Sequence, residues 1–153
     1  MIVFRLSKSK FANDLSGKGA EKSGGRWNSK GTALVYTSNS RALCTTEIAV
    51  HTPLGNIPLD YMLVTIEIPD DISLQEISGT KLSTDWKSFP HSNSTQEMGD
   101  KFVADCKFAV LKVPSAVVQG DFNFLINPSL AESARIKILS FEPFSFDERL
   151  FYR

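Results

Sequence analysis

The chain has 153 residues, of which 42% are hydrophobic and 22% charged, and its eleven phenylalanines argue against disorder. This size and composition are typical of one globular domain, so residues 1–153 are expected to form a single domain. The 17 basic and 17 acidic residues cancel. A net charge of zero excludes the overall positive field that is typical of a nucleic-acid-binding protein. It also favours association with a partner or with a second copy of the chain.

The first residues contain neither a basic segment nor a long apolar core, and no apolar run reaches the length of a transmembrane helix. The sequence therefore predicts a cytoplasmic protein that does not enter a membrane. Cys44 and Cys106 lie in helical, partly apolar runs. We interpret both as reduced residues of the core, with one disulfide as the alternative.

The first part of the chain predicts two strands separated by a loop. Residues 2–6 form a short apolar run typical of a strand, and residues 11–22 are polar and contain glycines, which indicates a loop. Residues 32–37 are strand-like, with Leu34 and Tyr36 on one face.

A helix is predicted over residues 40–51, capped by Ser38 or Asn39. Its expected inward stripe consists of Ala42, Leu43, Thr46, Ala49 and Val50. Glu47 lies at the edge of this apolar face. Carboxylates seldom lie there unless they are paired or functional, so Glu47 is either a structural acid with a partner or an acid of a functional site.

The rest of the chain consists mainly of predicted strands, at residues 61–68, 72–77, 108–113, 122–126 and 135–141. A polar loop over residues 79–93 precedes a helix that opens on the capping-box pattern from Ser94 to Glu97 and runs to about Cys106, with Phe102 and Val103 inward. About six strands, interrupted by two or three helices, give a largely antiparallel α+β fold.

Three further residue types can carry chemistry. Arg26 follows a glycine pair and can bind a phosphate or carboxylate with two hydrogen bonds, although a solvated loop arginine is the plainer alternative. Tyr36 is either a packing aromatic or a stacking surface. Ser115 ends a buried strand and is either a turn residue or a hydroxyl aimed into a cleft. His51 and His91 have no metal-ligand spacing, so no metal site is expected.

Together these residues resemble the RES-domain family, named for an arginine, a glutamate and a serine. The resemblance covers nearly the whole chain and includes Phe4-Arg5, SGGRWNSKG at residues 23–31, VYTS at 35–38, Glu47 with His51, Trp86, Gly99-Asp100, VPS at 113–115, NPS at 127–129 and FDERL at 146–150. One departure is Ser129-Leu130, where the family often has a histidine after Asn-Pro.

The resemblance implies an ADP-ribosyltransferase-like fold, with NAD as the substrate and no metal. It also implies a toxin of a bacterial toxin–antitoxin pair, held inactive by an Xre-type helix-turn-helix antitoxin. Some members of the family degrade NAD by hydrolysis or phosphorolysis, and others ADP-ribosylate a protein. The expected function is NAD cleavage at the nicotinamide–ribose bond, and the alternatives are protein ADP-ribosylation and a non-catalytic nucleotide-binding or interaction module.

The resemblance also assigns roles to residues. Glu47 is expected to stabilise a ribosyl cation, Arg26 to hold the pyrophosphate or the adjoining ribose, and Tyr36 to stack on nicotinamide. The further substrate contacts expected are Arg5, Trp27, Asn28, Ser115 and Asn127.

Overall fold

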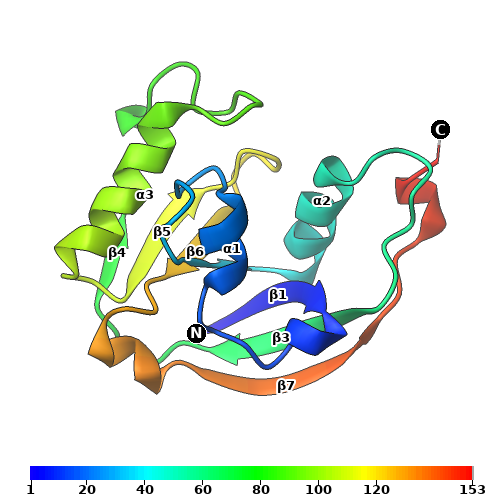
Figure 1. Cartoon of the computed structure of the whole chain (residues 1–153), viewed down its shortest axis with the longest axis horizontal. Helices are drawn as coiled ribbons and strands as arrows, with labels where there is room; N and C mark the ends of the chain where they lie inside the picture. Colours follow the sequence, from blue (N-terminus) through cyan, green and yellow to red (C-terminus); the bar gives the residue numbers. More distant parts are fainter. Residues whose placement is uncertain (153) are drawn as a thin grey trace.

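The computed structural model describes residues 1–152, and its framework is one seven-stranded sheet with the strand order β4-β5-β6-β2-β1-β3-β7 (Figure 1). The strands are β1 (Ile2–Lys8), β2 (Val35–Ser38), β3 (Tyr61–Glu67), β4 (Leu74–Glu76), β5 (Val110–Pro114), β6 (Phe122–Ile126) and β7 (Lys137–Phe144). All neighbouring strands run antiparallel except β4 and β5. The predicted α+β class is confirmed.

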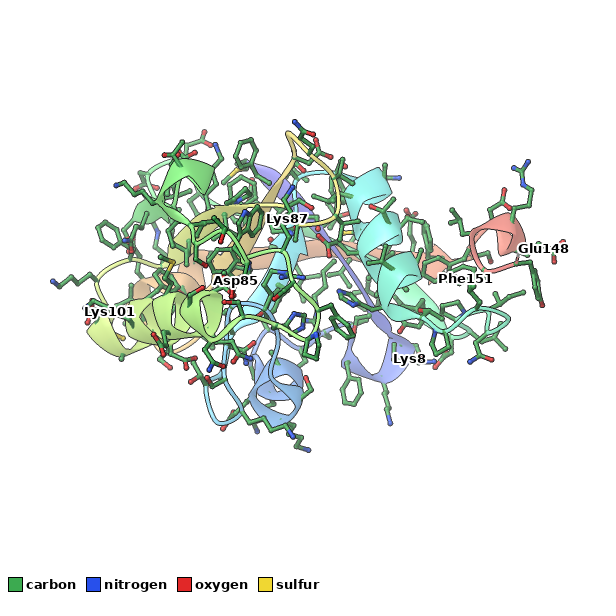
Figure 2. All side chains as sticks on the ribbon, turned by 90° about the horizontal axis from the view of Figure 1, so that it is seen from above. Lys8, Asp85, Lys87, Lys101, Glu148 and Phe151 are labelled. Atoms are coloured by element: carbon green, nitrogen blue, oxygen red, sulfur yellow. The ribbon has the colours of Figure 1, made fainter. Side chains whose placement is uncertain are left out.

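Three α-helices accompany the sheet in the described part of the chain: α1 (Lys18–Ser23), α2 (Arg41–His51) and α3 (Asn93–Asp105). Figure 1 shows α3 beside β4 and β5, and α2 above the β1 side of the sheet. Short 3-10 turns occur at Ser9–Phe11, Gly79–Lys81, Ala131–Arg135 and Glu148–Leu150. Seen from above, Lys101 of α3 and Glu148 lie toward opposite ends of the molecule (Figure 2).

Alternate residues of a strand point to opposite faces of the sheet. In the middle of this sheet, apolar clusters cover both faces. Val35 and Ile126 pack in one apolar cluster, whereas their neighbours Leu34 and Leu125 pack in another with Trp27. The strand β2 has only four residues, yet it pairs with both β1 and β6. This short central strand therefore lies between two apolar clusters, and Tyr36 packs against the one that contains Trp27.

The first helix was not predicted. The loop expected over residues 11–22 contains most of α1, which begins after Gly17 in the left-handed conformation at φ 73°. The backbone nitrogen of Leu34 would lie only 2.7 Å from a Cβ at residue 17, so this close approach also requires glycine. The glycines that indicated a loop therefore mark a tight helix entry.

The predicted helix over residues 40–51 is confirmed as α2, but its cap and its inward stripe differ from the prediction. Ser40 is the N-cap, since its side chain accepts a hydrogen bond from the Leu43 N–H at 3.0 Å. Leu43 and Cys44 are buried, whereas Ala42 is exposed and Val50 is 58% exposed. The helix packs on β1 and β2 through its first turns, and Val50 in its last turn remains exposed.

The second long helix is also confirmed, with Ser92 rather than Ser94 as its cap: the Ser92 hydroxyl accepts from the Ser94 N–H at 3.2 Å. Phe102 is buried as predicted. Cys106 ends α3 in the left-handed conformation at φ 50° and is exposed, which contradicts its assignment to the core. Cys44 is buried as expected, and both cysteines are free thiols.

In the part of the chain that the structure describes, no helix combines the length and the apolar character needed to cross a membrane.

Candidate active site

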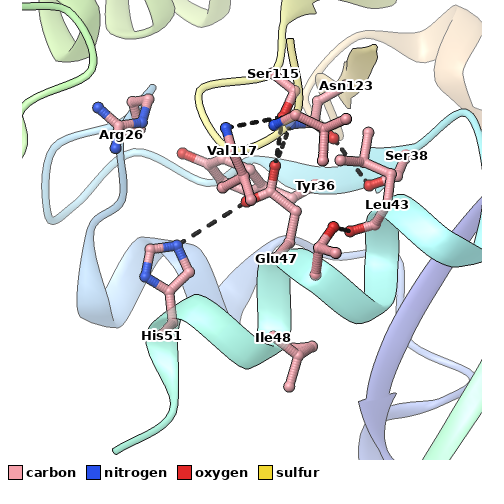
Figure 3. Close-up of polar contacts among 12 residues, drawn as sticks. Arg26, Tyr36, Ser38, Leu43, Glu47, Ile48, His51, Ser115, Val117 and Asn123 are labelled. Carbon is pink, nitrogen blue, oxygen red and sulfur yellow. Dashed lines mark hydrogen bonds and ion pairs between the residues drawn. The ribbon is translucent and has the colours of Figure 1, made fainter. Parts of the chain in front are cut away.

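A cavity of about 440 Å³ opens between the N-terminal segment, the glycine loop and α2. Five residues singled out in the sequence line it: Arg5, Arg26, Trp27, Tyr36 and Glu47. They come from β1, the loop after α1, β2 and α2. The fold therefore brings together the arginine, the tyrosine and the glutamate that lie on three local structures in the sequence (Figure 3).

The glycine loop is organised by Asn28, which is fully buried. Its side-chain nitrogen donates to the carbonyls of Ala20 at 2.8 Å and Thr32 at 2.9 Å, and its side-chain oxygen accepts from the Tyr36 hydroxyl at 2.6 Å. A Cβ at Gly25 would lie 2.7 Å from that hydroxyl, so only glycine fits there. Asn28 does not line the cavity; its amide holds the loop that carries Arg26.

The Tyr36 hydroxyl is engaged in the protein itself, because it also accepts the Trp27 N–H at 3.0 Å. Burial raises the pKa of Tyr36 well above the ordinary value of a phenol, so the hydroxyl stays protonated at neutral pH. The ring, rather than the hydroxyl, is therefore the part of Tyr36 that remains for a ligand in the cavity.

Arg26 connects the glycine loop to the segment before α3. Its Nη1 atom donates to the carbonyls of Trp86 at 2.6 Å and Ser88 at 3.1 Å. Within residues 1–152, its Nε and Nη2 atoms have no hydrogen-bond partner. Burial lowers the pKa of the guanidinium and the charge of Glu47 opposes this shift, but arginine remains protonated in either case. Arg26 thus offers a fixed cation with unused donors.

Glu47 lies on α2 with its side chain 25% exposed. Its Oε1 atom accepts hydrogen bonds from the Asn123 side-chain amide at 2.9 Å and the Ser115 hydroxyl at 3.2 Å. Its Oε2 atom lies 4.0 Å from Nε2 of His51. Figure 3 shows the carboxylate between these partners. One oxygen is therefore held by the protein, and the other remains on the side of the histidine.

Ser115 and Asn123 are themselves held in place. The Ser115 hydroxyl accepts the backbone N–H groups of Val117 at 3.1 Å and Val118 at 3.0 Å while donating to Glu47. The Ser38 hydroxyl donates to the Asn123 side-chain oxygen at 2.8 Å. The sequence pointed to Ser115 but not to Ser38 or Asn123. These two face each other in the antiparallel register of β2 and β6, so only the strand pairing could have revealed them.

Of the other residues predicted to contact substrate, Arg5 lies at the cavity and Asn127 does not. Arg5 lines the cavity, and its Nη1 atom donates to the backbone carbonyl of Asp14. Burial lowers the pKa of its guanidinium, with the charge of Asp14 acting in the opposite sense. Asn127 is buried outside the cavity, where its side chain accepts the Ser129 N–H at 3.0 Å and donates to the Val103 carbonyl at 3.4 Å. The structure therefore does not bring Asn127 to the other site residues.

Three aromatic rings pack together beside the carboxylate. The His51 ring lies 6.0 Å from Phe89 and 6.3 Å from His91, and the Phe89 and His91 centroids are 5.3 Å apart. Both histidines line the cavity. Burial lowers the pKa of His91, and the charges of Arg26 and His51 lower it further, which favours a neutral ring.

No group of three or more His, Cys, Asp or Glu side chains in residues 1–152 is arranged to hold a metal ion.

The architecture is that of an α+β domain with one mainly antiparallel sheet. It is similar to the crystal structure of the Mycobacterium tuberculosis MbcT–MbcA toxin–antitoxin complex, with a TM-score of 0.76 at 19% identity over 98% of this chain and 86% of that chain. The RES domain model matches residues 2–147. The chain belongs to the RES-domain family.

Two curated relatives agree with this membership. The chain is 37% identical over 141 residues to the Prs ADP-ribosylating toxin of Sphingobium sp. (strain YBL2), covering 91% of this chain and 88% of that protein. It is 35% identical over 155 residues to Toxin Res of Pseudomonas putida KT2440, covering 99% of this chain and all of that protein. The family expected from the sequence motifs is confirmed.

Proposed function

We propose that this chain is the toxin of a bacterial toxin–antitoxin pair and that it consumes NAD by cleaving the nicotinamide–ribose bond, through hydrolysis or phosphorolysis. The observation that carries the proposal is the hydrogen bonding of the Glu47 carboxylate. Its Oε1 atom is fixed by Ser115 and Asn123, while its Oε2 atom remains for a ligand in the cavity that Arg26 and Tyr36 also line. Relatives named as toxins support the biological role.

The chemistry needs this kind of site. Nicotinamide leaves NAD as a neutral molecule, so its departure requires no general acid. The ribose carbon becomes an oxocarbenium-like cation, and a fixed carboxylate stabilises the charge that develops there. Because Glu47 is already held by two donors, it needs little reorganisation as the cation forms.

The cavity also suits a dinucleotide. A volume of about 440 Å³ lies in the usual range for small-molecule sites. Arg26 and Arg5 offer positive charge for the pyrophosphate, and the Tyr36 ring offers a stacking surface for nicotinamide. Asn28 supports this arrangement through the glycine loop.

A second candidate is ADP-ribosylation of a protein by the same site. The name of the Sphingobium relative, an ADP-ribosylating toxin, favours it. The two functions share the bond that breaks and differ only in the acceptor that takes the ribosyl group.

The products distinguish these functions. The purified chain is incubated with NAD labelled on the adenine side, with and without inorganic phosphate, and then with a lysate of the host. We expect nicotinamide together with ADP-ribose, or with ADP-ribose phosphate when phosphate is present. Label on a protein band without bulk NAD loss would instead support the second candidate. NAD binding without nicotinamide release would contradict both and leave a non-catalytic module.

We further propose that an Xre-type helix-turn-helix antitoxin in the cytoplasm binds over the cavity, since the fold neighbour is a toxin–antitoxin complex. The zero net charge of the chain offers no repulsion to such a partner. Co-expression with a helix-turn-helix protein recovered from the host by pull-down should give a stable complex that releases no nicotinamide from NAD. A complex that retains full activity would contradict binding over the cavity.

A further inference from the structure

The space between the side chains of Glu47 and His51 is large enough for one small group. The Oε2 atom of Glu47 and the Nε2 atom of His51 are 4.0 Å apart, and both residues line the cavity (Figure 3). This separation is longer than a hydrogen bond. An oxygen atom at about 2.8 Å from each of them fits beside the line that joins them. The pair can therefore hold one water molecule, whose two O–H groups donate to the two atoms.

The two atoms are available for such a group. The Oε1 atom of Glu47 already accepts from Ser115 and Asn123, which leaves Oε2 as the free acceptor. His51 is the last residue of α2, and its side chain is 48% exposed, so a molecule can reach it from solvent. The centroid of its ring lies 6.0 Å from that of Phe89 and 6.3 Å from that of His91, both on the segment before α3.

We propose that this gap is the acceptor site of the reaction and that His51 is the general base that deprotonates the acceptor hydroxyl. This inference rests on the proposed cleavage of NAD. The bond between the ribose carbon and nicotinamide breaks, and its electron pair leaves with nicotinamide. In the same step the acceptor oxygen forms a bond to the ribose carbon, and its proton passes to Nε2 of His51. Water is the simplest acceptor, and phosphate or a protein hydroxyl supplies the same O–H group.

The roles of the two side chains are then distinct. Glu47 stabilises the cation and orients the acceptor, whereas His51 acts only when the acceptor carries a proton. Arg26 is a charged group of another element that acts on both Glu47 and His91, and its Nη1 atom is bound to backbone carbonyls. Arg26 cannot take up a proton, and the Nε2 atom of His51 is the ring nitrogen that lies 4.0 Å from Oε2 of Glu47, so His51 is the base at the gap.

The test is His51→Gln with azide as a second nucleophile, measured as nicotinamide release from NAD. We expect kcat to fall about 10²-fold, the usual effect of losing a general base, with KM for NAD within twofold of the wild type. Azide has no proton to lose, so it should restore release in the variant and give ADP-ribosyl azide. Glu97→Gln is the control, because it removes an exposed side chain of α3 that does not line the cavity, and it should change neither turnover nor the response to azide.

The outcomes separate this inference from the proposed function. Wild-type turnover by His51→Gln would overturn the acceptor site and leave NAD cleavage intact. A slow variant that azide does not restore would show a structural role for His51, which also overturns the acceptor site. Failure of the wild type to release nicotinamide with water, phosphate or lysate would overturn both.

Discussion

Glu47→Gln should lower NAD turnover by about 10²-fold or more, comparable to the loss of one preorganised electrostatic group. The substitution keeps the shape of the side chain, and the Gln oxygen can accept the same bonds from Ser115 and Asn123. The folded state therefore loses little stability. The melting temperature should stay level or rise, because a charge that serves function often destabilises the fold. Turnover and thermal unfolding of the same preparation measure both effects.

Glu97→Gln is the matched control, because it removes a helical glutamate that is exposed on α3. It should change neither turnover nor melting temperature. NAD binding by the Glu47 variant should persist in part, since Arg26 and the glycine loop are unchanged. A variant that melts much lower but retains its activity per folded molecule would mean that Glu47 is a structural acid.

The second large effect is expected at Gly99, where α3 touches the backbone of the glycine loop. A Cβ at this position would lie 1.6 Å from the Trp27 carbonyl oxygen, so Gly99→Ala forces α3 and the loop apart. The helix preference for alanine, about 1 kcal/mol, does not offset this overlap. We expect a loss of about 3 kcal/mol in the free energy of unfolding, the upper end for overpacking, measured by denaturant titration.

Turnover by the folded fraction of Gly99→Ala should fall as well. Asp100, the next residue, accepts the Ser29 N–H at 2.9 Å, so displacement of α3 also pulls on the loop that positions Arg26. Gly79→Ala provides the comparison, because no atom lies within 4 Å of its added Cβ. Equal stability of the two alanine variants would show that α3 does not hold the loop.

The order of strands and long helices was accessible from the sequence because their signals are local. Period-two alternation found β3, and a short apolar run found β1. The inward face of α2 was misjudged, because the helix packs on the sheet with Leu43 and Cys44 while Glu47 on its flank lines a cavity. The prediction assumed that one face of the helix packs against a single apolar core. It does not describe a helix that has a core on one side and a cavity on the other.

The site was predictable in part for the same reason. Arg26, Tyr36 and Glu47 have distinctive types and do line one cavity; their catalytic roles stay predictions. Asn123 gave no signal, because a single asparagine in a strand becomes a partner of Glu47 only through sheet pairing. Conversely, Asn28 and Asn127 were expected to touch substrate, but their amides hold backbone groups of the chain itself.

The order of synthesis determines when Glu47 acquires its hydrogen-bond partners. Asn123 follows Glu47 by 76 residues, an interval of about 4–15 s at roughly 5–20 residues per second. Until β6 has left the ribosome, β2 lacks one of its two neighbours and the carboxylate lacks its fixed donors. For the proposed toxin, the growing chain therefore lacks a complete site until β6 has been made, and an inhibitor produced by the same cell has that interval in which to accumulate.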